Sequence, residues 1–367
     1  MAVTRLTIVG TGLIGASLGL AARGRGVEVA GWDPDREALA AAVERGAVEA
    51  AESLAQAVAD AELVVVAAPV ASLPGEVAAV LGATGEETTV SDVGSTKTSV
   101  VAAAGGSPRF IGGHPIAGKE AHGAEHASAG LFEGATWFLT PTADTSPARY
   151  KLLHRFVVDL GAFPHAIEPS AHDELVALTS HLPHVLANVV VNQAGATQVE
   201  GHDPLENPGG SLRDMTRIAG ANPRLWREIF LDNADAVRAG LAEHRRRIEE
   251  VERALERRDD EFIGRWIGEA AANRRRMLEV AYGDAGALQR VQIHVADRPN
   301  VLAEVTHAFG AARIDIRDFE LDHVSPEQGG TLTLIVSGEE DARRISGVLE
   351  SQGYGVVVSP VLDVDES

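Results

Sequence analysis

The sequence contains no cysteine, few aromatic residues and a clear shortage of basic relative to acidic side chains. The absence of cysteine excludes disulfide bonds, thiolate nucleophiles and cysteine-based zinc sites, and it is compatible with a reducing cytoplasm. The formal net charge of -21, from 53 acidic and 32 basic residues, disfavours binding to nucleic acid or to anionic membranes. The sequence also lacks an uninterrupted apolar run of the roughly 18 residues that a membrane helix needs. We therefore expect a cytoplasmic protein without a nucleic-acid or membrane partner.

The first part of the chain alternates short β-branched runs with alanine-rich segments. The predicted strands are residues 6–9, 27–32, 63–67, 88–91 and 110–111. Continuous apolar strands separated by helices are typical of a parallel sheet that is covered on both faces. The pattern predicts the α/β class and a Rossmann-type, doubly wound domain over residues 1–165.

Long amphipathic segments replace the strand pattern from Ser170 to about Tyr282. Asn222 followed by Pro223 suits the start of a helix, which we expect to run to about Arg258. These helices have more apolar surface than one small domain can cover by itself. The pattern predicts an all-α dimerisation domain over residues 166–285 and a homodimer.

Strand and helix patterns alternate again after Gly286. Strands are predicted at residues 290–295, 314–321, 331–336 and 355–361, with helices after Pro299 and over 339–351. This is the β-α-β-β-α-β order of a ferredoxin-like module, in a length that can fold independently. We expect such a domain over residues 288–364.

A glycine-rich loop, Gly10-Thr11-Gly12-Leu13-Ile14-Gly15, follows the first predicted strand and begins a helix. In this context the first glycine allows a tight turn, the second admits a pyrophosphate and the third permits close helix packing. Asp33 ends the next strand, where a carboxylate accepts hydrogen bonds from ribose hydroxyls and repels a 2′-phosphate. The loop and Asp33 predict NAD as cofactor; the alternative is that the glycines only serve a tight turn.

Two further strand ends carry candidate site residues. Ala68 and Pro69 follow the strand over 63–67 and are expected near the nicotinamide. Ser95 follows the strand over 88–91 at the sheet edge where ligands bind in this fold. It is a candidate partner for a reacting hydroxyl group, and the alternative is that it caps the next helix.

His114 lies in a second glycine-rich loop, Gly112-Gly113-His114-Pro115-Ile116-Ala117-Gly118. A histidine beside a bound nicotinamide can take the proton of a hydroxyl group that is being oxidised. The alternative is a hydrogen-bonded loop histidine with no catalytic role. The nearby pair His122 and His126 has no acidic or cysteine partner at zinc spacing and suits the surface of a helix, so no metal site is expected.

The helical region contains two groups of candidate substrate ligands. Ser180-His181-Leu182-Pro183-His184 is expected to begin a helix that places His181 and His184 on neighbouring surface. Arg213 and Arg217 are one helical turn apart and form a fork suited to carboxylates. The alternative for the arginines is a surface ion-pair face with Asp214.

Taken together, these motifs resemble the prephenate and arogenate dehydrogenase family over residues 6 to about 282. The motifs that carry the resemblance are Gly10-x-Gly12-Leu13-Ile14-Gly15, Asp92-x-x-Ser95-x-Lys97, Gly113-His114-Pro115-x-x-Gly118-x-Glu120, Ser180-His181-Leu182-Pro183-His184 and Arg213-x-x-x-Arg217. The resemblance implies NAD-dependent oxidative decarboxylation of prephenate in tyrosine biosynthesis. It also implies that His114 is the catalytic base and that Ser95 assists it. Arg217, Arg213 and His184 would bind substrate, and Glu120 would lie at the cleft mouth.

The C-terminal module resembles an ACT domain, a type that often binds amino acids, so tyrosine is the first effector to consider. Asn300 stands where that pattern has glycine. Three other functions remain alternatives on the sequence: an arogenate dehydrogenase, a non-catalytic NAD-linked amino-acid sensor, and a 2-hydroxy acid dehydrogenase. The last would place a catalytic lysine on the first helix of the second domain, where this chain has two histidines.

Overall fold

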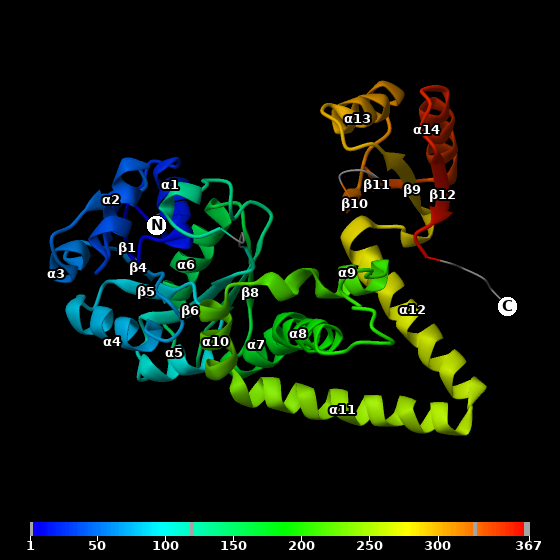
Figure 1. Cartoon of the computed structure of the whole chain (residues 1–367). Helices are drawn as coiled ribbons and strands as arrows, with labels where there is room; N and C mark the ends of the chain where they lie inside the picture. Colours follow the sequence, from blue (N-terminus) through cyan, green and yellow to red (C-terminus); the bar gives the residue numbers. More distant parts are fainter. Residues whose placement is uncertain (1–2, 118–120, 326–328, 363–367) are drawn as a thin grey trace. The chain divides into compact units, whose positions relative to one another are not determined.

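The computed structural model describes residues 3–117, 121–325 and 329–362. Its contacts divide the chain into two compact units, Met1–Arg246 and Arg247–Ser367, and the division falls inside one long helix (Figure 1). The predicted domains over 1–165, 166–285 and 288–364 are a finer division, which these contacts do not test and which stays a prediction.

An eight-stranded sheet forms the centre of the first unit, in the order β3-β2-β1-β4-β5-β6-β7-β8. The strands are β1 (Arg5–Val9), β2 (Glu28–Trp32), β3 (Glu49–Ala50), β4 (Leu63–Val66), β5 (Thr89–Asp92), β6 (Phe110–Pro115), β7 (Thr136–Thr140) and β8 (Phe163–Ala166). The run from β3 to β6 is parallel and has the 3-2-1-4-5-6 order of dinucleotide-binding sheets. The doubly wound α/β prediction is confirmed, although β7, which the sequence analysis did not identify, pairs antiparallel with β6.

Helices cover both faces of this sheet because its central strands are apolar on both sides. Along β1, Leu6 and Ile8 pack into one core and Val9 packs into the other, as the alternation of side chains along a strand requires. The first core takes apolar side chains from α1 (Leu13–Arg23), α2 (Arg36–Glu44) and α6 (Pro147–Asp159), and the second from α3 (Leu54–Val58), α4 (Leu73–Ala83) and α5 (Thr98–Ala103). The sheet is thus held rigidly enough to fix the ends of β1, β4, β5 and β6 at one edge.

A continuous helical segment over residues 169–195 follows β8. It consists of α7 (Pro169–Val176), a π-helical turn η2 (Ala177–His181) and α8 (Leu182–Gly195). The prediction that Ser180 and His181 begin a helix is therefore wrong. Pro183 has no amide hydrogen to donate along a helix, and the wider π turn immediately before it keeps the helix continuous across this residue.

By length and composition alone, this segment is long and apolar enough to cross a membrane. It also carries His172, Asp173 and His181, whose side chains are buried and hydrogen-bonded. Buried polar partners of this kind favour a helix packed against protein over one in contact with lipid. Core helices of soluble proteins satisfy the same length criterion, so the segment is weak support for a membrane span.

The remaining helices of this region are α9 (Gly210–Thr216), a short 3-10 helix η3 (Arg217–Gly220), α10 (Pro223–Asp232), α11 (Ala234–Arg257) and α12 (Asp260–Tyr282). Asn222 caps α10 by accepting hydrogen bonds from the backbone of Arg224 and Leu225, as predicted. The predicted continuous helix to Arg258 is wrong, because the chain leaves the helical conformation at Asn233. The buried Asn233 side chain donates to the carbonyl oxygen of Asp173 instead.

The second unit contains a four-stranded antiparallel sheet with the order β10-β11-β9-β12. The elements that follow α12 in this unit are η4 (Ala285–Ala287), β9 (Leu288–Val295), α13 (Val301–Ala312), β10 (Asp318–Ser325), β11 (Gly329–Ser337), α14 (Glu339–Ser351) and β12 (Val356–Pro360). Both helices contribute to a common core with the sheet. The predicted ferredoxin-like β-α-β-β-α-β module is confirmed. Asn300 precedes α13 in the left-handed conformation that asparagine tolerates better than most residues.

Candidate active site

Three glycines shape the loop between β1 and α1. Gly10 has φ of +94°, and a β-carbon there would lie 2.5 Å from the carbonyl oxygen of Ala67. A β-carbon on Gly15 would lie 2.0 Å from the carbonyl oxygen of Gly10, so this glycine permits the close packing of α1. A β-carbon on Gly12 would meet no atom within 4 Å. The open side of Gly12 leaves room for a ligand to approach the backbone at the start of α1, which is a favourable place for a phosphate.

Asp33 fastens this loop to the end of β2. One carboxylate oxygen accepts from the amide of Thr11 at 2.7 Å and from its hydroxyl at 3.2 Å, and the other accepts from the amide of Asp35 at 2.9 Å. Each carboxylate oxygen can accept more than one hydrogen bond, and Asp33 lines the adjoining cleft. Its role as an acceptor for ribose hydroxyls stays a prediction.

A cleft of about 790 Å³ runs along this edge of the sheet and brings the predicted cofactor and catalytic residues together. Among the predicted site residues, those that line it are Gly10, Gly12, Leu13, Ile14, Asp33, Ala68, Pro69, Ser95 and His114. Gly15 lies beneath the loop and does not line the cleft. This volume lies within the usual range of sites for small molecules and cofactors.

Ser95 follows β5, and its hydroxyl is buried without a hydrogen-bond partner among the described residues. It does not cap α5, because the backbone amides of Lys97 and Thr98 donate to the carboxylate of Asp173 at 2.8 Å each. The structure therefore excludes the capping alternative. A buried hydroxyl without a partner is costly unless a ligand supplies one, so Ser95 is suited to a hydrogen bond with bound substrate or cofactor.

A buried ion pair holds the ends of β5 and β6 together. Lys97 and Asp92 are both fully buried and their charged groups are in contact. The lysine also donates to the carbonyl oxygen of Gly113 at 2.8 Å, and the amide of Gly113 donates to Asp92 at 3.0 Å. Removing one partner of such a pair typically costs about 3–5 kcal/mol of stability. The pair thus fixes the residue immediately before His114.

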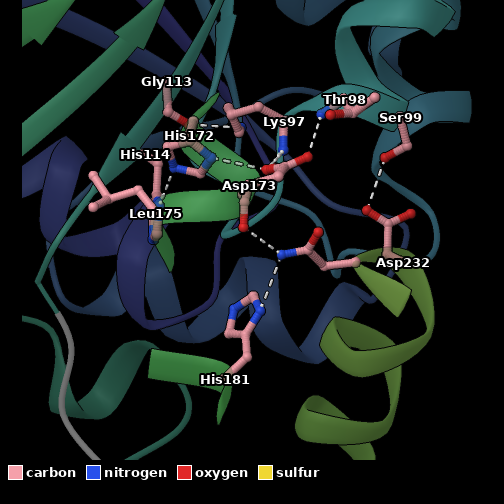
Figure 2. A network of polar contacts seen from close by, with 12 residues as sticks. Lys97, Thr98, Ser99, Gly113, His114, His172, Asp173, Leu175, His181 and Asp232 are labelled. Carbon is pink, nitrogen blue, oxygen red and sulfur yellow. Dashed lines mark hydrogen bonds and ion pairs between the residues drawn. The ribbon is translucent and has the colours of Figure 1, made fainter. Parts of the chain in front are cut away.

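His114 is linked to His172 of helix α7 by one hydrogen bond, and a second connects His172 to Asp173 on the same helix (Figure 2). Its Nδ1 lies 2.9 Å from Nε2 of His172, and Nδ1 of His172 lies 2.9 Å from a carboxylate oxygen of Asp173. The edge of the Phe138 ring meets the His172 ring at 5.5 Å between centroids. His114 therefore lies on strand β6 and not in the predicted loop, and it is hydrogen-bonded while also lining the cleft.

The electrostatic environment makes His114 a neutral ring and Asp173 an anion. Burial lowers the pKa of His114 well below 6.5, and the charge of Lys97, together with any protonation of His172 or His181, acts in the same direction. Burial by itself raises the pKa of Asp173, but hydrogen bonds from His172, Thr98 and Lys97 outweigh it and lower this pKa. A neutral imidazole beside a fixed carboxylate can accept a proton at neutral pH.

The predicted substrate ligands lie apart from the described cleft. His184 stacks on Trp226 with 3.4 Å between ring centroids, and burial lowers the pKa of His184. Arg213 is half-buried in α9 and Arg217 is exposed at the start of η3. None of the three lines the described part of the cleft. Glu120 lies outside the residues that the structure describes.

The alternative of an ion-pair face with Asp214 has no contact to support it, since neither arginine pairs with a carboxylate in the described ranges. The second histidine pair also differs from expectation. His122 and His126 do not share one solvated α-helix: only Ala124–His126 is helical, as a 3-10 turn. His122 instead contacts the side chain of Asn222 at 2.9 Å and lines the cleft.

Sequence reasoning missed the polar residues on α7 that support His114. His172 and Asp173 are adjacent in an amphipathic segment and have no glycine or proline beside them to distinguish them from surface residues. Asn233 was also missed, although its buried side chain holds Asp173 and contacts His181 at 3.1 Å. For His172 and Asp173, only their polar character on a mostly apolar helical segment could have pointed to them.

Two family models match the chain over most of its length. "Prephenate dehydrogenase, nucleotide-binding domain" matches residues 16–164, and "Prephenate dehydrogenase, dimerization domain" matches residues 168–269. The prephenate dehydrogenase of Bacillus subtilis is 30% identical over 357 residues, which cover 95% of this chain and 96% of that protein.

Solved structures agree with this assignment. The prephenate dehydrogenase of A. aeolicus, in complex with hydroxyphenyl propionate and NAD+, superimposes with a TM-score of 0.70 and 29% identity, covering 76% of this chain and 99% of that one. The arogenate dehydrogenase of Synechocystis gives a TM-score of 0.68 and 27% identity, covering 74% and 98%. The chain belongs to the prephenate dehydrogenase family of NAD-dependent oxidoreductases.

Proposed function

We propose that the protein catalyses the NAD-dependent oxidative decarboxylation of prephenate to 4-hydroxyphenylpyruvate, with release of CO2 and NADH. The observation that carries this proposal is the arrangement of one cleft. In it, a neutral histidine and a serine hydroxyl without a described partner lie near a glycine loop and the acidic residue that follows the neighbouring strand β2. The relatives whose names include prephenate dehydrogenase support the same reaction.

The residues that would hold NAD are those of the loop at the first strand and its neighbours. Gly10, Gly12, Leu13 and Ile14 would face the pyrophosphate, Asp33 the ribose, and Ala68 with Pro69 the nicotinamide end; Gly15 would support the loop from below. When bound, NAD supplies the acceptor for the hydride that leaves C4 of the substrate ring. The carboxylate of Asp33 would disfavour NADP because of its negative charge.

His114 acts as the base in this proposal, with Ser95 as hydrogen-bond partner of the 4-hydroxyl. His114 takes the hydroxyl proton as the hydride leaves C4, which forms a carbonyl group at that carbon. The electron pair of the bond between C1 and the ring carboxylate then moves through the ring to the oxygen, and CO2 leaves. The imidazolium returns its proton to the resulting phenolate. Aromatisation of the ring makes the sequence favourable.

The two carboxylates of prephenate require cationic partners in a strongly acidic protein. We assign Arg217, Arg213 and His184 to this role, because both arginines are without a carboxylate partner in the described ranges. Glu120 is assigned to the mouth of the cleft on the family resemblance alone. Which arginine takes the ring carboxylate is a matter for kinetics with substrate analogues that lack one carboxylate.

Arogenate is the second candidate substrate, because it differs from prephenate only in carrying an amino group in place of the keto group. The similarity to the arogenate dehydrogenase of Synechocystis favours testing it. The test is NADH production from purified prephenate and arogenate, each with NAD and NADP. We expect turnover with prephenate and NAD; faster turnover with arogenate would reassign the substrate, and no NADH from either would favour the non-catalytic sensor.

We infer a homodimer that forms through the helical region from α7 to α10. Large apolar side chains are left exposed there in the single chain, including Leu178 at 60%, Val189 at 53% and Leu231 at 71%. Such faces are typical of a surface that another copy covers. Sedimentation equilibrium should give twice the chain mass of 38.5 kDa, and a monodisperse monomer would contradict the inference.

For the C-terminal module we propose an ACT-like regulatory role with tyrosine as the first effector to test. A cavity of about 400 Å³ is lined by Asp297, Arg298, Asn300 and Leu321, which supports binding of a small polar molecule. We expect tyrosine to change the reaction rate or the melting temperature. If neither tyrosine nor phenylalanine changes either quantity, the module is structural only.

A further inference from the structure

Asp173 begins a line of hydrogen bonds that leads from helix α7 to the cleft (Figure 2). Its two carboxylate oxygens accept the backbone amides of Lys97 and Thr98 at the start of α5, at 2.8 Å each. The side-chain amide of Asn233 donates to the backbone carbonyl oxygen of Asp173 at 2.8 Å. Since backbone amides can only donate, the carboxylate is held in one orientation as an acceptor.

The carboxylate determines which nitrogen of His172 carries the proton. Nδ1 of His172 lies 2.9 Å from the Asp173 oxygen, so in the neutral ring Nδ1 is the donor and Nε2 carries a lone pair. The His172 side chain is fully buried, so its ring nitrogens depend on protein partners for their hydrogen bonds. His172 thus presents an acceptor to whatever lies beyond its Nε2.

That acceptor faces His114. Nδ1 of His114 lies 2.9 Å from Nε2 of His172, so Nδ1 must donate the hydrogen of this bond. The other nitrogen of His114, Nε2, is then the unprotonated one. Because His114 lines the cleft, a lone pair and not an N–H group is available to a hydroxyl group bound there. The opposite tautomer would donate to that hydroxyl and could not accept its proton.

We propose that His172 and Asp173 are positioning residues that keep His114 in the tautomer with Nε2 as the free base. The inference rests on the proposed role of His114 as base. The charged and titratable groups that face His114 are Lys97, His172, His181 and Asp173, and only Asp173 is negative. When His114 takes the substrate proton, its Nδ1–H remains bonded to His172, and the Asp173 carboxylate behind it stabilises the new positive charge.

The test compares two replacements of His172. Glutamine can place a carbonyl oxygen where Nε2 of His172 stands, whereas leucine cannot accept a hydrogen bond. We expect His172→Leu to lower kcat about a hundredfold with little change in either KM, and His172→Gln to stay within about tenfold of the wild type. In a His114→Ala background, His172→Leu should cause no further loss of kcat. Melting temperatures of all variants separate unfolding from a change in chemistry.

A spectroscopic measurement on the NAD-free protein tests the tautomer without any assay. In 15N-histidine NMR spectra above neutral pH, with the His114 signals assigned by their loss in His114→Ala, we expect a protonated Nδ1 and an unprotonated Nε2. The His172→Leu variant should show a mixture of tautomers. A protonated Nε2 in the wild type, wild-type kcat in His172→Leu, or equal losses of kcat in both His172 variants would each overturn the proposal. Failure of the proposed function is distinct, since it would appear as no NADH from prephenate in the wild type.

Discussion

The two walls of the cleft are built in different ways. The wall around β1 and α1 uses backbone: three glycines set its shape, and Asp33 fastens the loop over a span of 22 residues through hydrogen bonds to Thr11. The wall at His114, called the side-chain wall below, is supported from behind by buried side chains of α7. The supporting contacts join residues far apart in the sequence: His114 and His172 are separated by 58 positions, and Lys97 and Asp173 by 76. One wall is suited to hold a ligand, and the other to move a proton.

The difference determines how each wall can fail. A backbone loop loses its function when a side chain fills the space that a ligand needs, and this need not change stability. A buried polar network loses function when one donor or acceptor is removed, and then the remaining partners are left buried and unpaired. Substitutions in the two walls should therefore separate into effects on cofactor binding and effects on turnover.

Replacement of the base should give the largest effect. We expect His114→Ala to lower kcat about 10²–10⁴-fold and to leave NAD affinity close to the wild type, because the glycine loop remains intact. Steady-state kinetics and a fluorescence titration with NADH measure the two quantities. Near-normal turnover would remove His114 from the mechanism and with it the assignment of this wall to proton transfer.

Loss of the proposed carboxylate partner should come next. Arg217→Ala should raise the KM for prephenate about 10–100-fold, since a charge-assisted hydrogen bond is lost, and leave the KM for NAD unchanged. Arg213→Ala is the matched comparison, one helical turn away. An unchanged KM for prephenate in both variants would move the carboxylate site elsewhere.

The wall around the loop between β1 and α1, called the glycine wall here, can be probed by filling the open side of Gly12. Gly12→Ala adds a methyl group that meets no protein atom within 4 Å, so we expect unchanged stability but an increase of about tenfold in the KM for NAD. Gly82→Ala, on the exposed surface of α4 and equally free of neighbours, serves as control. A wild-type KM for NAD in Gly12→Ala would show that the pyrophosphate lies elsewhere.

The smallest expected effect is on the pH dependence of the protein's stability, through the buried His181. Burial lowers the pKa of His181 to about 4, and the charges of His172 and His184 act in the same direction, against Asp173. An unfolded histidine has a pKa of about 6.5, so between these values the unfolded chain binds the extra proton. Keeping His181 neutral therefore favours the folded protein. This contribution to stability is complete above pH 6.5 and is lost as the pH falls to about 4. Denaturant unfolding of wild type and His181→Gln should show a weaker pH dependence in the variant; equal dependence would contradict this pKa.

The glycine wall was predictable because its signals are local. The order of strand, glycine loop, helix and Asp33 is contiguous in sequence, and each residue type is required by a specific backbone geometry. Gly10, Gly12, Leu13 and Ile14 line the cleft and Gly15 lies beneath the loop, while their contacts with NAD stay a prediction. The β-α-β-β-α-β module was predictable for the same reason, since period-two runs and short helices alternate in a fixed order.

The side-chain wall was only partly predictable. His114 stood out because glycine and proline surround it, whereas His172 and Asp173 lie in a helix and become important only through contacts with residues far away in sequence. The break at Asn233 was missed because nothing near it interrupts a helix; the buried contact with Asp173 overrides the local preference. The π turn before Pro183 likewise depends on the packing of the whole segment.

Coupling of hydride transfer to loss of the ring carboxylate can be measured directly. NADH is followed by absorbance and CO2 by trapping in one reaction of the purified protein with prephenate and NAD. We expect NADH and CO2 in a one-to-one ratio, together with 4-hydroxyphenylpyruvate. NADH without CO2, or no NADH while NAD still binds, would contradict it.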